Sequence, residues 1–335
     1  MNGDSPEVVI LRALLEAGED FVSGSALAEQ LAMSRVAVWQ HMEKLRDEGF
    51  EFEAIRSRGY RLINRPSALN ATLLRATLPH RHGRVGIYVL DTIDSTNDEV
   101  MRRLTAGETA PFAVIAREQT RGRGRLGRSW HSEPNGNLYI SFGFRPLLPP
   151  DRMPTFTLWI GANLCELIAS YCRIAPRLKW PNDLLIDGRK AGGILTEARV
   201  DADQIRDLVL GLGLNLLPPR DGWRPDLSGR ATSLSEATGA AIDVNRLAAA
   251  LVGRVLTAYE TFHQGAHQTS FDKLWARFDA LRERPITLLH GDERISGVAE
   301  GIEPDGTLIL RLPDDSKKRF RAGEVTIGTA GGAPK

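Results

Sequence analysis

The sequence is poor in cysteine, with only Cys165 and Cys172 among its 335 residues. Both lie on a stretch with helical periodicity, where a separation of seven residues places them roughly 10 Å apart along the axis. Because a disulfide requires a shorter separation, these two cysteines are not expected to pair. We expect buried free thiols, which are typical of a protein in a reducing cytoplasm.

The sequence also lacks a long apolar run and a strong net charge. No stretch of about 18 residues is free of polar breaks, and the N-terminus is acidic and interrupted, unlike a signal peptide. These absences predict a soluble intracellular protein that makes no membrane contact. The formal net charge is +1, so any surface that binds nucleic acid must be local.

Two nucleotide-binding signatures are missing as well. No segment matches the phosphate-binding loop G-x-x-x-x-G-K-[ST]. The segment Gly122–Gly127 does match G-x-G-x-x-G, but that fingerprint requires a helix after the third glycine. The chain instead continues as HSEPNGNLYISFGF, a turn followed by an alternating strand. A dinucleotide-binding fold is therefore excluded.

The most prominent feature of the chain is a loop rich in glycine and arginine, TRGRGRLGRSW at Thr120–Trp130. Glycine lets a backbone approach a ligand closely, and arginine presents a planar fork that matches carboxylate and phosphate. Neighbouring arginines repel one another unless solvent or an anion lies among them. The strand-like stretches Phe112–Ala116 and Asn137–Phe144 flank the loop, which argues against a disordered basic tail. The pattern predicts a loop that wraps a multiply anionic ligand.

Residues 1–64 predict a winged helix-turn-helix domain. After a first amphipathic helix, Ser23 and Ser34 are suitable N-cap residues for two short helices joined by a tight turn. The second of these is expected at Arg35–Glu48, with Gly49 at its end. The segment Phe52–Ile63 then predicts a small hairpin, the wing.

In such a domain the last helix lies in the major groove of DNA. Outward-facing residues of that helix would read base edges, and wing arginines would contact phosphates. The candidates for DNA contact are Arg35, Trp39, Gln40, Arg56 and Arg58. The alternative is a winged helix that serves only in packing or dimerisation, with Trp39 against a partner domain.

Two further segments follow the Arg65–Pro66 linker. Residues 67–280 alternate irregularly between apolar strands and helices, which predicts an α+β domain with a sheet. We expect helices at Asn97–Leu104, Thr155–Cys172 and, as the last clear one, Asp243–His263, and strands that include Ala191–Glu197 and Leu208–Leu216. Residues 284–328 contain only short strand patterns between turn clusters, which predicts a small β-barrel.

Five motifs in the central segment occur in a characteristic order. They are DSTN at Asp94–Asn97, GRGRLGR at Gly122–Arg128, KWPNDL at Lys179–Leu184, RKAGGIL at Arg189–Leu195 and GLGLN at Gly211–Asn215. Together they closely resemble the biotin–protein ligases, and the N-terminal helix-turn-helix resembles the bifunctional form that is also a biotin operon repressor. One departure is Leu126, where some relatives carry a basic residue. The resemblance implies a class II synthetase-like central domain with a mixed sheet and an SH3-like C-terminal barrel.

The resemblance also implies an ATP-dependent reaction, in which biotin is activated to biotinyl-5′-AMP and transferred to a lysine of the biotin carboxyl carrier protein of acetyl-CoA carboxylase. It implies a homodimer when the adenylate is bound, and operon DNA as a second partner. A carboxylate that attacks a phosphate brings two anions together, so the site must supply cations.

By resemblance, each motif residue receives a role. The catalytic residues would be Lys190, Arg123 and Arg125. Biotin would contact Ser95, Thr96, Asn97, Gln119, Gly122, Arg123, Trp130, Tyr139, Lys190 and Gly193. ATP and the adenylate would contact Arg125, Arg128, Trp130, Asn182 and Asn215. Asp183 is a candidate carboxylate for Mg²⁺, because a triphosphate arrives with that ion.

Two other functions remain open at this point. A lipoate–protein ligase shares the fold and the adenylation chemistry, but lipoate has no ureido group, so the polar set Ser95, Thr96 and Gln119 favours biotin. A biotin-sensing DNA-binding regulator without catalysis is the other alternative, and the intact set of arginines and Lys190 argues against it.

Overall fold

The computed structural model describes residues 4–83, 85–132 and 136–328. The chain forms two compact units. One contains the N-terminal part through Val89 together with Asp243–Gly253, and the other contains Leu90–Ile242 together with the chain from Arg254 onward. None of the helices in the described ranges is long and apolar enough to cross a membrane.

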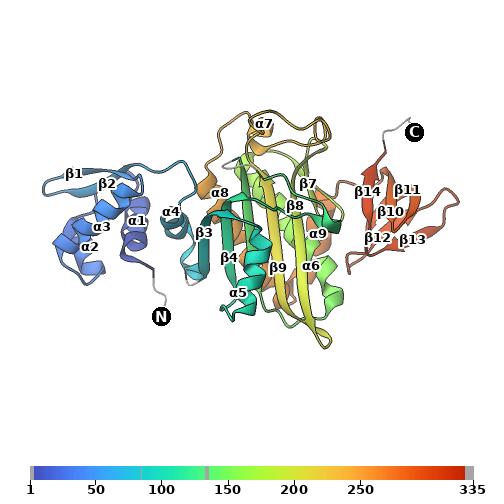
Figure 1. The fold of residues 1–335 in the computed structure, drawn as a ribbon, viewed down its shortest axis with the longest axis horizontal. Helices are drawn as coiled ribbons and strands as arrows, with labels where there is room; N and C mark the ends of the chain where they lie inside the picture. Colours follow the sequence, from blue (N-terminus) through green and yellow to red (C-terminus); the bar gives the residue numbers. More distant parts are fainter. Residues whose placement is uncertain (1–3, 84, 133–135, 329–335) are drawn as a thin grey trace. The chain divides into compact units, whose positions relative to one another are not determined.

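The N-terminal part is a winged helix-turn-helix, as expected. Its elements are α1 (Pro6–Ala17), α2 (Gly24–Gln30), α3 (Arg35–Asp47), β1 (Glu51–Ile55), β2 (Gly59–Asn64) and α4 (Ala71–Thr77) (Figure 1). The Ser23 and Ser34 side chains accept capping hydrogen bonds from Ala26 and Ala37. Strands β1 and β2 pair as the antiparallel wing. Local capping chemistry therefore determines where the helices of this domain begin.

Helix α4 extends the core of this domain beyond the wing. Leu73 and Ala76 of α4 join the buried cluster formed by residues of α1, α2 and α3. Arg12 of α1 donates to the Arg75 carbonyl at 3.1 Å, which caps the end of α4 with a cation. The apolar cluster therefore includes residues that follow the predicted linker.

The second unit is built on a seven-stranded sheet with the order β3-β4-β5-β9-β8-β7-β6. The strands are β3 (Gly86–Ile93), β4 (Phe112–Gln119), β5 (Asn137–Phe144), β6 (Pro176–Lys179), β7 (Asp183–Ile186), β8 (Arg189–Asp201) and β9 (Gln204–Asn215). Figure 1 labels β3, β4, β9, β8 and β7 from left to right, and β5 lies between β4 and β9. In the spatial order β4-β5-β9-β8-β7-β6, each strand pairs antiparallel with the next.

Strand β3 runs parallel to β4, which makes the sheet mixed. Asp91 pairs with Arg117, Thr92 with Glu118, and Ile93 O accepts from the Thr120 N–H, so residue numbers rise together along both strands. Helix α5 (Thr96–Thr105) connects them, as a parallel crossover requires. The predicted α+β class with a mixed sheet is therefore confirmed.

Helices cover both faces of the sheet. Strand β5 is buried along Leu138–Phe144, although successive side chains point to opposite faces. Helix α5 packs against β4, β5 and β9, and α6 (Met153–Cys172) packs against β6 and β8. Phe144 stacks on Tyr259 of α8 (Val244–His263) with ring centroids 4.0 Å apart. A short α7 (Leu234–Thr238) follows β9.

Two expectations about this unit are wrong in detail. The chain has another helix, α9 (Phe271–Phe278), after the one expected to be the last. Its buried residues Phe271, Trp275 and Phe278 follow the i, i+4, i+7 pattern, but the helix is only eight residues long. Strands β8 and β9 also extend past the predicted Ala191–Glu197 and the predicted start at Leu208, because polar residues continue the pairing toward the end of the hairpin.

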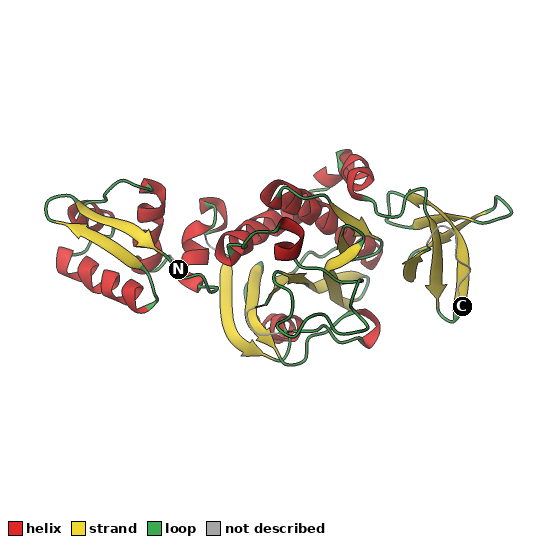
Figure 2. Cartoon of the chain, turned by 90° about the horizontal axis from the view of Figure 1, so that it is seen from above, coloured by secondary structure: helices red, strands yellow, loops and turns green. Residues whose placement is uncertain are grey.

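The C-terminal part is a five-stranded antiparallel sheet with the order β13-β12-β11-β10-β14. Its strands are β10 (Pro285–His290), β11 (Glu293–Ile302), β12 (Leu308–Arg311), β13 (Lys317–Phe320) and β14 (Glu324–Ile327). After α9 every described element is a strand (Figure 2). The short strands and turn clusters of the sequence therefore form the expected small all-β domain.

Candidate active site

The glycine–arginine loop folds back on itself after β4. The Gly124 N–H donates to Arg128 O at 2.7 Å, which joins the two arms of the loop. Residues Arg125–Gly127 form one 3-10 turn at the tip. Leu126, the departure from the basic residue of some relatives, is 73% exposed there. The loop is therefore a narrow ribbon with a defined turn.

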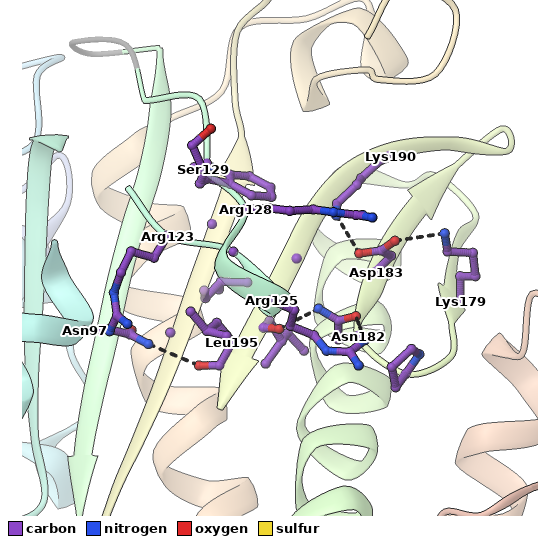
Figure 3. A pocket seen from close by; sticks show the side chains of 18 of the residues that line it. Asn97, Arg123, Arg125, Arg128, Ser129, Lys179, Asn182, Asp183, Lys190 and Leu195 are labelled. Atoms are coloured by element: carbon purple, nitrogen blue, oxygen red, sulfur yellow. Dashed lines mark hydrogen bonds and ion pairs between the residues drawn. The ribbon is translucent and has the colours of Figure 1, made fainter. Parts of the chain in front are cut away.

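The glycine–arginine loop borders a cavity of about 320 Å³ (Figure 3). The N-terminus of α5, the β6–β7 hairpin and strands β8 and β9 line much of the remainder. The residues predicted from the sequence that line it are Ser95, Thr96, Asn97, Gln119, Arg123, Arg125, Arg128, Trp130, Tyr139, Asn182, Asp183, Lys190 and Gly193. Segments far apart in the sequence thus meet around one cavity.

Two predicted ligand residues lie elsewhere. Gly122 and Asn215 border a neighbouring cavity of about 1030 Å³. A Cβ on Gly122 would lie 2.5 Å from Ser132 Oγ and 2.7 Å from Trp130 O, so packing within the loop accounts for this glycine. The Asn215 amide donates to Thr232 O at 3.0 Å. Both have structural roles, and their contact with a ligand stays a prediction.

Uncharged polar groups gather at one end of the smaller cavity. Gln119 Oε1 accepts from the Thr96 N–H at 2.8 Å and from the Thr96 hydroxyl at 3.0 Å. Ser141 Oγ lies 2.7 Å from Thr96 Oγ1 and 2.6 Å from Asn97 Oδ1. Because these groups are buried and mutually satisfied, their orientations are defined. This end suits an uncharged ligand group that needs both donors and acceptors.

The start of α5 lacks the side-chain hydrogen bond of a usual N-cap. Ser95 is the N-cap residue, but its side chain accepts no capping hydrogen bond, and Thr96 already belongs to the helix. Asp94 Oδ1 instead accepts from the Ser95 N–H at 2.8 Å. Ser95 is buried and lines the cavity. Ser95 therefore lines the cavity without capping the helix with its side chain.

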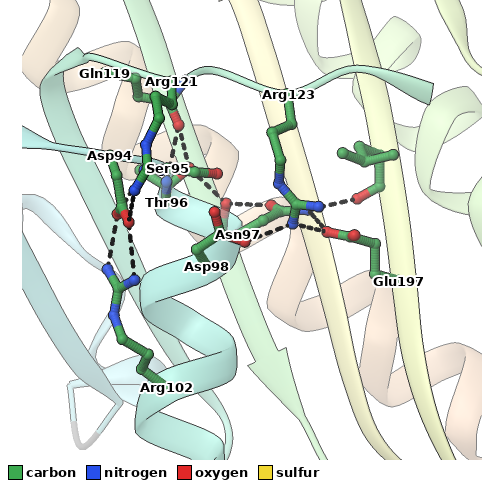
Figure 4. Close-up of polar contacts among 12 residues, drawn as sticks. Asp94, Ser95, Thr96, Asn97, Asp98, Arg102, Gln119, Arg121, Arg123 and Glu197 are labelled. Atoms are coloured by element: carbon green, nitrogen blue, oxygen red, sulfur yellow. Dashed lines mark hydrogen bonds and ion pairs between the residues drawn. The ribbon is translucent and has the colours of Figure 1, made fainter. Parts of the chain in front are cut away.

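Arg123 bridges two carboxylates at the edge of the cavity (Figure 4). Its Nη2 lies 2.7 Å from Asp98 Oδ1 and 2.7 Å from Glu197 Oε2. Glu197 Oε2 also accepts from Asn97 Nδ2 at 2.7 Å. Asp98 and Glu197 were not predicted, because they stand outside the motifs and become neighbours only when α5 packs beside β8. They hold Arg123 between the helix and the strand.

The neighbouring arginine of the loop is held by the same helix end. Arg121 Nη2 lies 3.3 Å from Asp94 Oδ2, and Arg102 makes hydrogen bonds of 2.8 and 3.0 Å to the same carboxylate. The hydrogen bond with Arg102 holds the pKa of Asp94 well below its usual range. Asp94 therefore stays ionised and anchors the first arm of the loop.

Two lysines converge on one carboxylate at the other end of the cavity. Asp183 Oδ1 lies 2.6 Å from Lys190 Nζ, and Asp183 Oδ2 lies 2.9 Å from Lys179 Nζ. Burial works to raise the pKa of Asp183, but the two ammonium groups outweigh burial, and the pKa lies below its usual value. Lys179 was not predicted, although it belongs to the KWPNDL motif. This end of the cavity is cationic.

Arg125 lies deeper in the same region. Its Nη1 donates to Asn182 Oδ1 at 3.0 Å, and the Asn182 amide donates to Ile194 O at 2.8 Å. Burial lowers the pKa of Arg125, opposed by Asp183 and Glu324, and an arginine nonetheless remains protonated at neutral pH. Asn182 therefore orients a cation and is more than a turn residue.

Trp130 lies flat against two glycines of the sheet. A Cβ on Gly213 would lie 2.7 Å from Trp130 Cε2, and one on Gly193 would lie 3.3 Å from Cζ3. Lys190 Nζ is 5.4 Å from the centre of the indole ring. The buried Nε1 of Trp130 has no hydrogen-bond partner among the described residues. The indole thus forms an apolar wall that still offers one donor.

The C-terminal sheet contributes a segment that sequence reasoning missed. Arg128 pairs with Glu324 at 2.6 Å, and Lys179 Nζ donates to Val325 O at 3.3 Å. Glu324, Val325 and Thr326 line the cavity. No local pattern marks these residues as functional, because only their position opposite the loop brings them to the site.

The predicted Mg²⁺ carboxylate, Asp183, lies among cations and not among other metal ligands in the described part of the chain. The described residues contain no group of three or more histidine, cysteine, aspartate or glutamate side chains that could hold a metal ion. Both oxygens of Asp183, the predicted Mg²⁺ carboxylate, face ammonium groups. We therefore assign no metal to Asp183.

The predicted DNA-contacting residues lie on α3 and the wing. Arg35, Trp39, Gln40 and Arg56 are exposed. Arg58 is also exposed, but its guanidinium lies over the Phe21 ring at 4.2 Å, so this arginine stiffens the base of the wing.

Three family models match consecutive parts of the chain. An HTH domain matches residues 9–61, the Biotin/lipoate A/B protein ligase family matches residues 89–215, and the Biotin protein ligase C terminal domain matches residues 283–328. These matches cover the helix-turn-helix, the sheet that carries the cavity, and the C-terminal strands.

Individual relatives match over nearly the whole chain. The bifunctional ligase/repressor BirA of Escherichia coli K12 is 34% identical over 96% of this chain and 97% of its own length. That of Bacillus subtilis strain 168 is 32% identical over 95% of this chain and 98% of its own. The solved biotin protein ligase from Aquifex aeolicus in complex with biotin and ATP has a TM-score of 0.60 at 28% identity, covering 72% of this chain and 98% of that one.

The fold and the cavity, with an uncharged polar end, an apolar wall and a cationic end, define a ligase of the adenylate-forming class that carries a DNA-binding domain. The matches then decide the family. The chain belongs to the biotin–protein ligases, in their bifunctional ligase/repressor form.

Proposed function

We propose that this chain activates biotin with ATP to biotinyl-5′-AMP and transfers biotin to a lysine of the biotin carboxyl carrier protein of acetyl-CoA carboxylase. The observation that carries this proposal is the cavity in which the polar set around Gln119 faces the cations Arg123, Arg125 and Lys190. That combination suits a ligand with an uncharged polar head at one end and a phosphorylated carboxylate at the other.

The first step joins two anions. A carboxylate oxygen of biotin forms a bond with the α-phosphorus of ATP, the bond from that phosphorus to the bridging oxygen breaks, and pyrophosphate leaves. Arg123 and Lys190 neutralise the carboxylate and the phosphoryl oxygens in this step, because fixed cations stabilise charge that develops between the reactants. Arg123 leaves Asp98 and Glu197 when the ligand offers it a competing anion.

The second step releases AMP. The amine of the carrier lysine attacks the carbonyl carbon of the adenylate, an amide forms, and AMP leaves with the bonding electron pair while the amine loses a proton. Trp130 covers the mixed anhydride against water, since the indole already forms the wall over Gly193 and Gly213. Closing the glycine–arginine loop over the adenylate therefore protects a hydrolysable intermediate.

Most of the binding roles follow the position of each residue around the smaller cavity, whereas those of Gly122 and Asn215, which border the neighbouring cavity, rest on the family motifs alone. The biotin head is held by Ser95, Thr96, Asn97 and Gln119, with Gly122, Tyr139 and Gly193 beside it. Adenylate contacts come from Arg125, Arg128, Trp130, Asn182 and Asn215. Mg²⁺ arrives on the phosphates of ATP and stays on them, because Asp183 is occupied by Lys179 and Lys190.

The chain also represses transcription of biotin genes when the adenylate is bound. The exposed Arg35, Trp39, Gln40 and Arg56 contact operator DNA. Two copies pair through the central sheets: β8 is bonded to β7 only as far as Gly193, so Leu195–Asp201 pair with β9 alone among the described residues. A free strand edge of this kind supports a symmetric sheet-to-sheet dimer, and adenylate favours it by linkage.

Three domains divide these tasks: residues 1–64 bind DNA, residues 67–280 hold biotin and ATP, and residues 284–328 complete the site with Glu324 and its neighbours. The thiols Cys165 and Cys172 are unpaired, which supports a reducing, cytoplasmic location.

A transfer assay tests the enzymatic proposal. The full chain is incubated with MgCl₂, ATP and a purified carrier domain, with either biotin or lipoate, and transfer is read by streptavidin blot or by the mass of the carrier domain. We expect transfer of biotin alone. Transfer of lipoate in preference would make the chain a lipoate ligase, and binding of biotin without any transfer would make it a sensor without catalysis.

A gel shift tests the repressor part. We expect DNA from upstream of biotin genes to be bound more tightly than random DNA, with tighter binding when biotin and ATP are present. Equal binding to both DNAs would leave a monofunctional enzyme.

A further inference from the structure

Helix α3 exposes two large apolar side chains on its outer face. Val36 is 67% exposed and Trp39 is 51% exposed. Trp39 is the one aromatic residue among the large hydrophobic side chains that are exposed in the described part of the chain. An exposed apolar pair of this size on a short helix indicates a surface that becomes covered by a partner.

Val36 and Trp39 point away from the domain core because the opposite face of α3 is buried. Val38, Met42 and Leu45 are buried in the core of the domain, and the Ser34 side chain caps the helix N-terminus. Val36 and Trp39 are three residues apart, so they are neighbours on the helix surface. They lie in the N-terminal half of α3, the half of a recognition helix that reaches base edges.

The surroundings of the pair are cationic and polar. Arg35 and Arg56 are exposed, and neither makes an ion pair within the described ranges, whereas Arg61 is held by Glu53. Gln40 lies beside Trp39 and is exposed. An apolar pair on a helix face that also exposes Arg35 and Gln40 suits the edge of a DNA groove, where phosphates flank the bases.

The major groove offers one apolar group at the edge of a base. Thymine carries a 5-methyl group there, whereas the edges of the other bases present hydrogen-bond donors and acceptors. We propose that Val36 and Trp39 read thymine 5-methyl groups, so that this pair sets a preference for thymine in the half-site. The proposal rests on DNA binding by the helix-turn-helix and specifies what that helix reads.

Replacing thymine by deoxyuridine tests the proposal, because the replacement removes the methyl group and leaves every hydrogen-bonding group in place. Duplexes are first selected from a random pool by the full chain with biotin and ATP. Affinities are then measured by fluorescence anisotropy at one salt concentration, with each thymine replaced in turn. Loss of a buried methyl group weakens binding by about fourfold, so we expect that loss at one or two positions in each half-site.

Variants connect the methyl groups to the two side chains. In Trp39→Ala and in Val36→Ala we expect weaker binding to the thymine duplex and no further loss at the position that each residue reads. Gln40→Ala is the matched control on the same helix face and keeps the full deoxyuridine effect. Arg56→Ala weakens binding to all duplexes equally and lowers the salt dependence. Circular dichroism checks that the exposed substitutions leave the fold intact.

Each other outcome overturns the proposal. Specific binding without any deoxyuridine effect, or an effect that persists in both Trp39→Ala and Val36→Ala, would show that the pair does not read methyl groups while DNA binding itself stands. Equal affinity for selected and random duplexes would refute specific DNA binding as well, and would assign the apolar pair to a protein partner.

Discussion

Lys190 Nζ lies 2.6 Å from Asp183 Oδ1, in a cavity whose opposite end carries the uncharged polar groups around Gln119. Asp183 also binds Lys179, so one carboxylate orients two ammonium groups without neutralising both. The three groups together keep a net positive charge at the end of the cavity where a triphosphate must be placed. The carboxylate acts as a positioning group for the cations.

Lys190→Ala is expected to lower the rate of adenylate formation about a hundredfold, since loss of one such contact to a transition state costs about 3 kcal/mol. Pyrophosphate exchange dependent on biotin measures this step. Arg189→Ala, one residue earlier on β8 and outside the cavity lining, is the matched control. A rate within a few-fold of the wild-type value would remove Lys190 from the mechanism.

Arg123→Ala is expected to weaken binding of both biotin and biotinyl-5′-AMP about tenfold or more, because hydrogen bonds to charged groups contribute about 1.5–3 kcal/mol each. Titration calorimetry measures both affinities. Arg121→Ala provides the comparison. Because Arg121 pairs with Asp94, this substitution should change the affinities for biotin and biotinyl-5′-AMP little. Unchanged affinities in Arg123→Ala would contradict a direct contact with the ligand.

Gly213→Ala is expected to weaken biotin binding by about 1–3 kcal/mol, the usual cost of overpacking. Its Cβ would lie 2.7 Å from Trp130 Cε2 and force the indole away from β9. Calorimetry in a double-mutant cycle tests this account, because the cost should largely disappear when Trp130 is already alanine. An equal cost in both backgrounds would show that the glycine serves the sheet and not the indole.

Glu7 ties α1 to α3 and makes the stability of this domain depend on pH. Its Oε1 lies 2.8 Å from His41 Nδ1 and 3.2 Å from Lys44 Nζ. Burial works to raise the pKa of Glu7, but the hydrogen bonds with His41 and Lys44 outweigh it and lower the pKa from 4.5 to about 2. The ionised carboxylate therefore stabilises the folded domain above pH 4.5, and the stabilisation is lost as the pH falls toward 2.

Glu7→Gln should accordingly speed hydrogen exchange in α1 and α3 several-fold at pH 7, and by less at pH 3. Mass spectrometry of the full chain compares variant and wild type at each pH, so that intrinsic exchange rates cancel. Glu29→Gln on the exposed side of α2 should have no effect. A difference between Glu7→Gln and wild type that is as large at pH 3 as at pH 7 would rule out the ionised carboxylate as its source.

Trypsin should cut the free protein between Arg121 and Arg128, and biotin with ATP should slow this cut strongly. Arg121, Arg123 and Arg128 pair with protein carboxylates at the surface, and exposed ion pairs contribute little stability. The glycine-rich backbone therefore still opens to the protease. Cleavage at Arg56 in the wing, followed in the same samples, controls for effects on trypsin itself. Equal cutting of the loop with and without ligands would show that it does not close over the site.

Much of the local structure could be predicted from the sequence. Strand β5 occupies the predicted Asn137–Phe144, and α3 starts where Ser34 predicts. Such boundaries depend on caps, turns and periodicity within a few residues of the chain. Helix α9 was not predicted, because its eight residues span only about two helical turns and its apolar periodicity is too short to recognise among the surrounding turns.

The five motifs and their order were enough to identify the family and most residues that line the cavity, through the resemblance that these motifs carry. Which charged side chains form ion pairs could be read only from the tertiary structure. Asp98, Glu197 and Glu324 hold loop arginines, and Lys179 joins Lys190 on Asp183. Ion pairs of this kind depend on side chains from α5, β8 and β14 reaching one place, and sheet packing across the chain, not local pattern, brings them there.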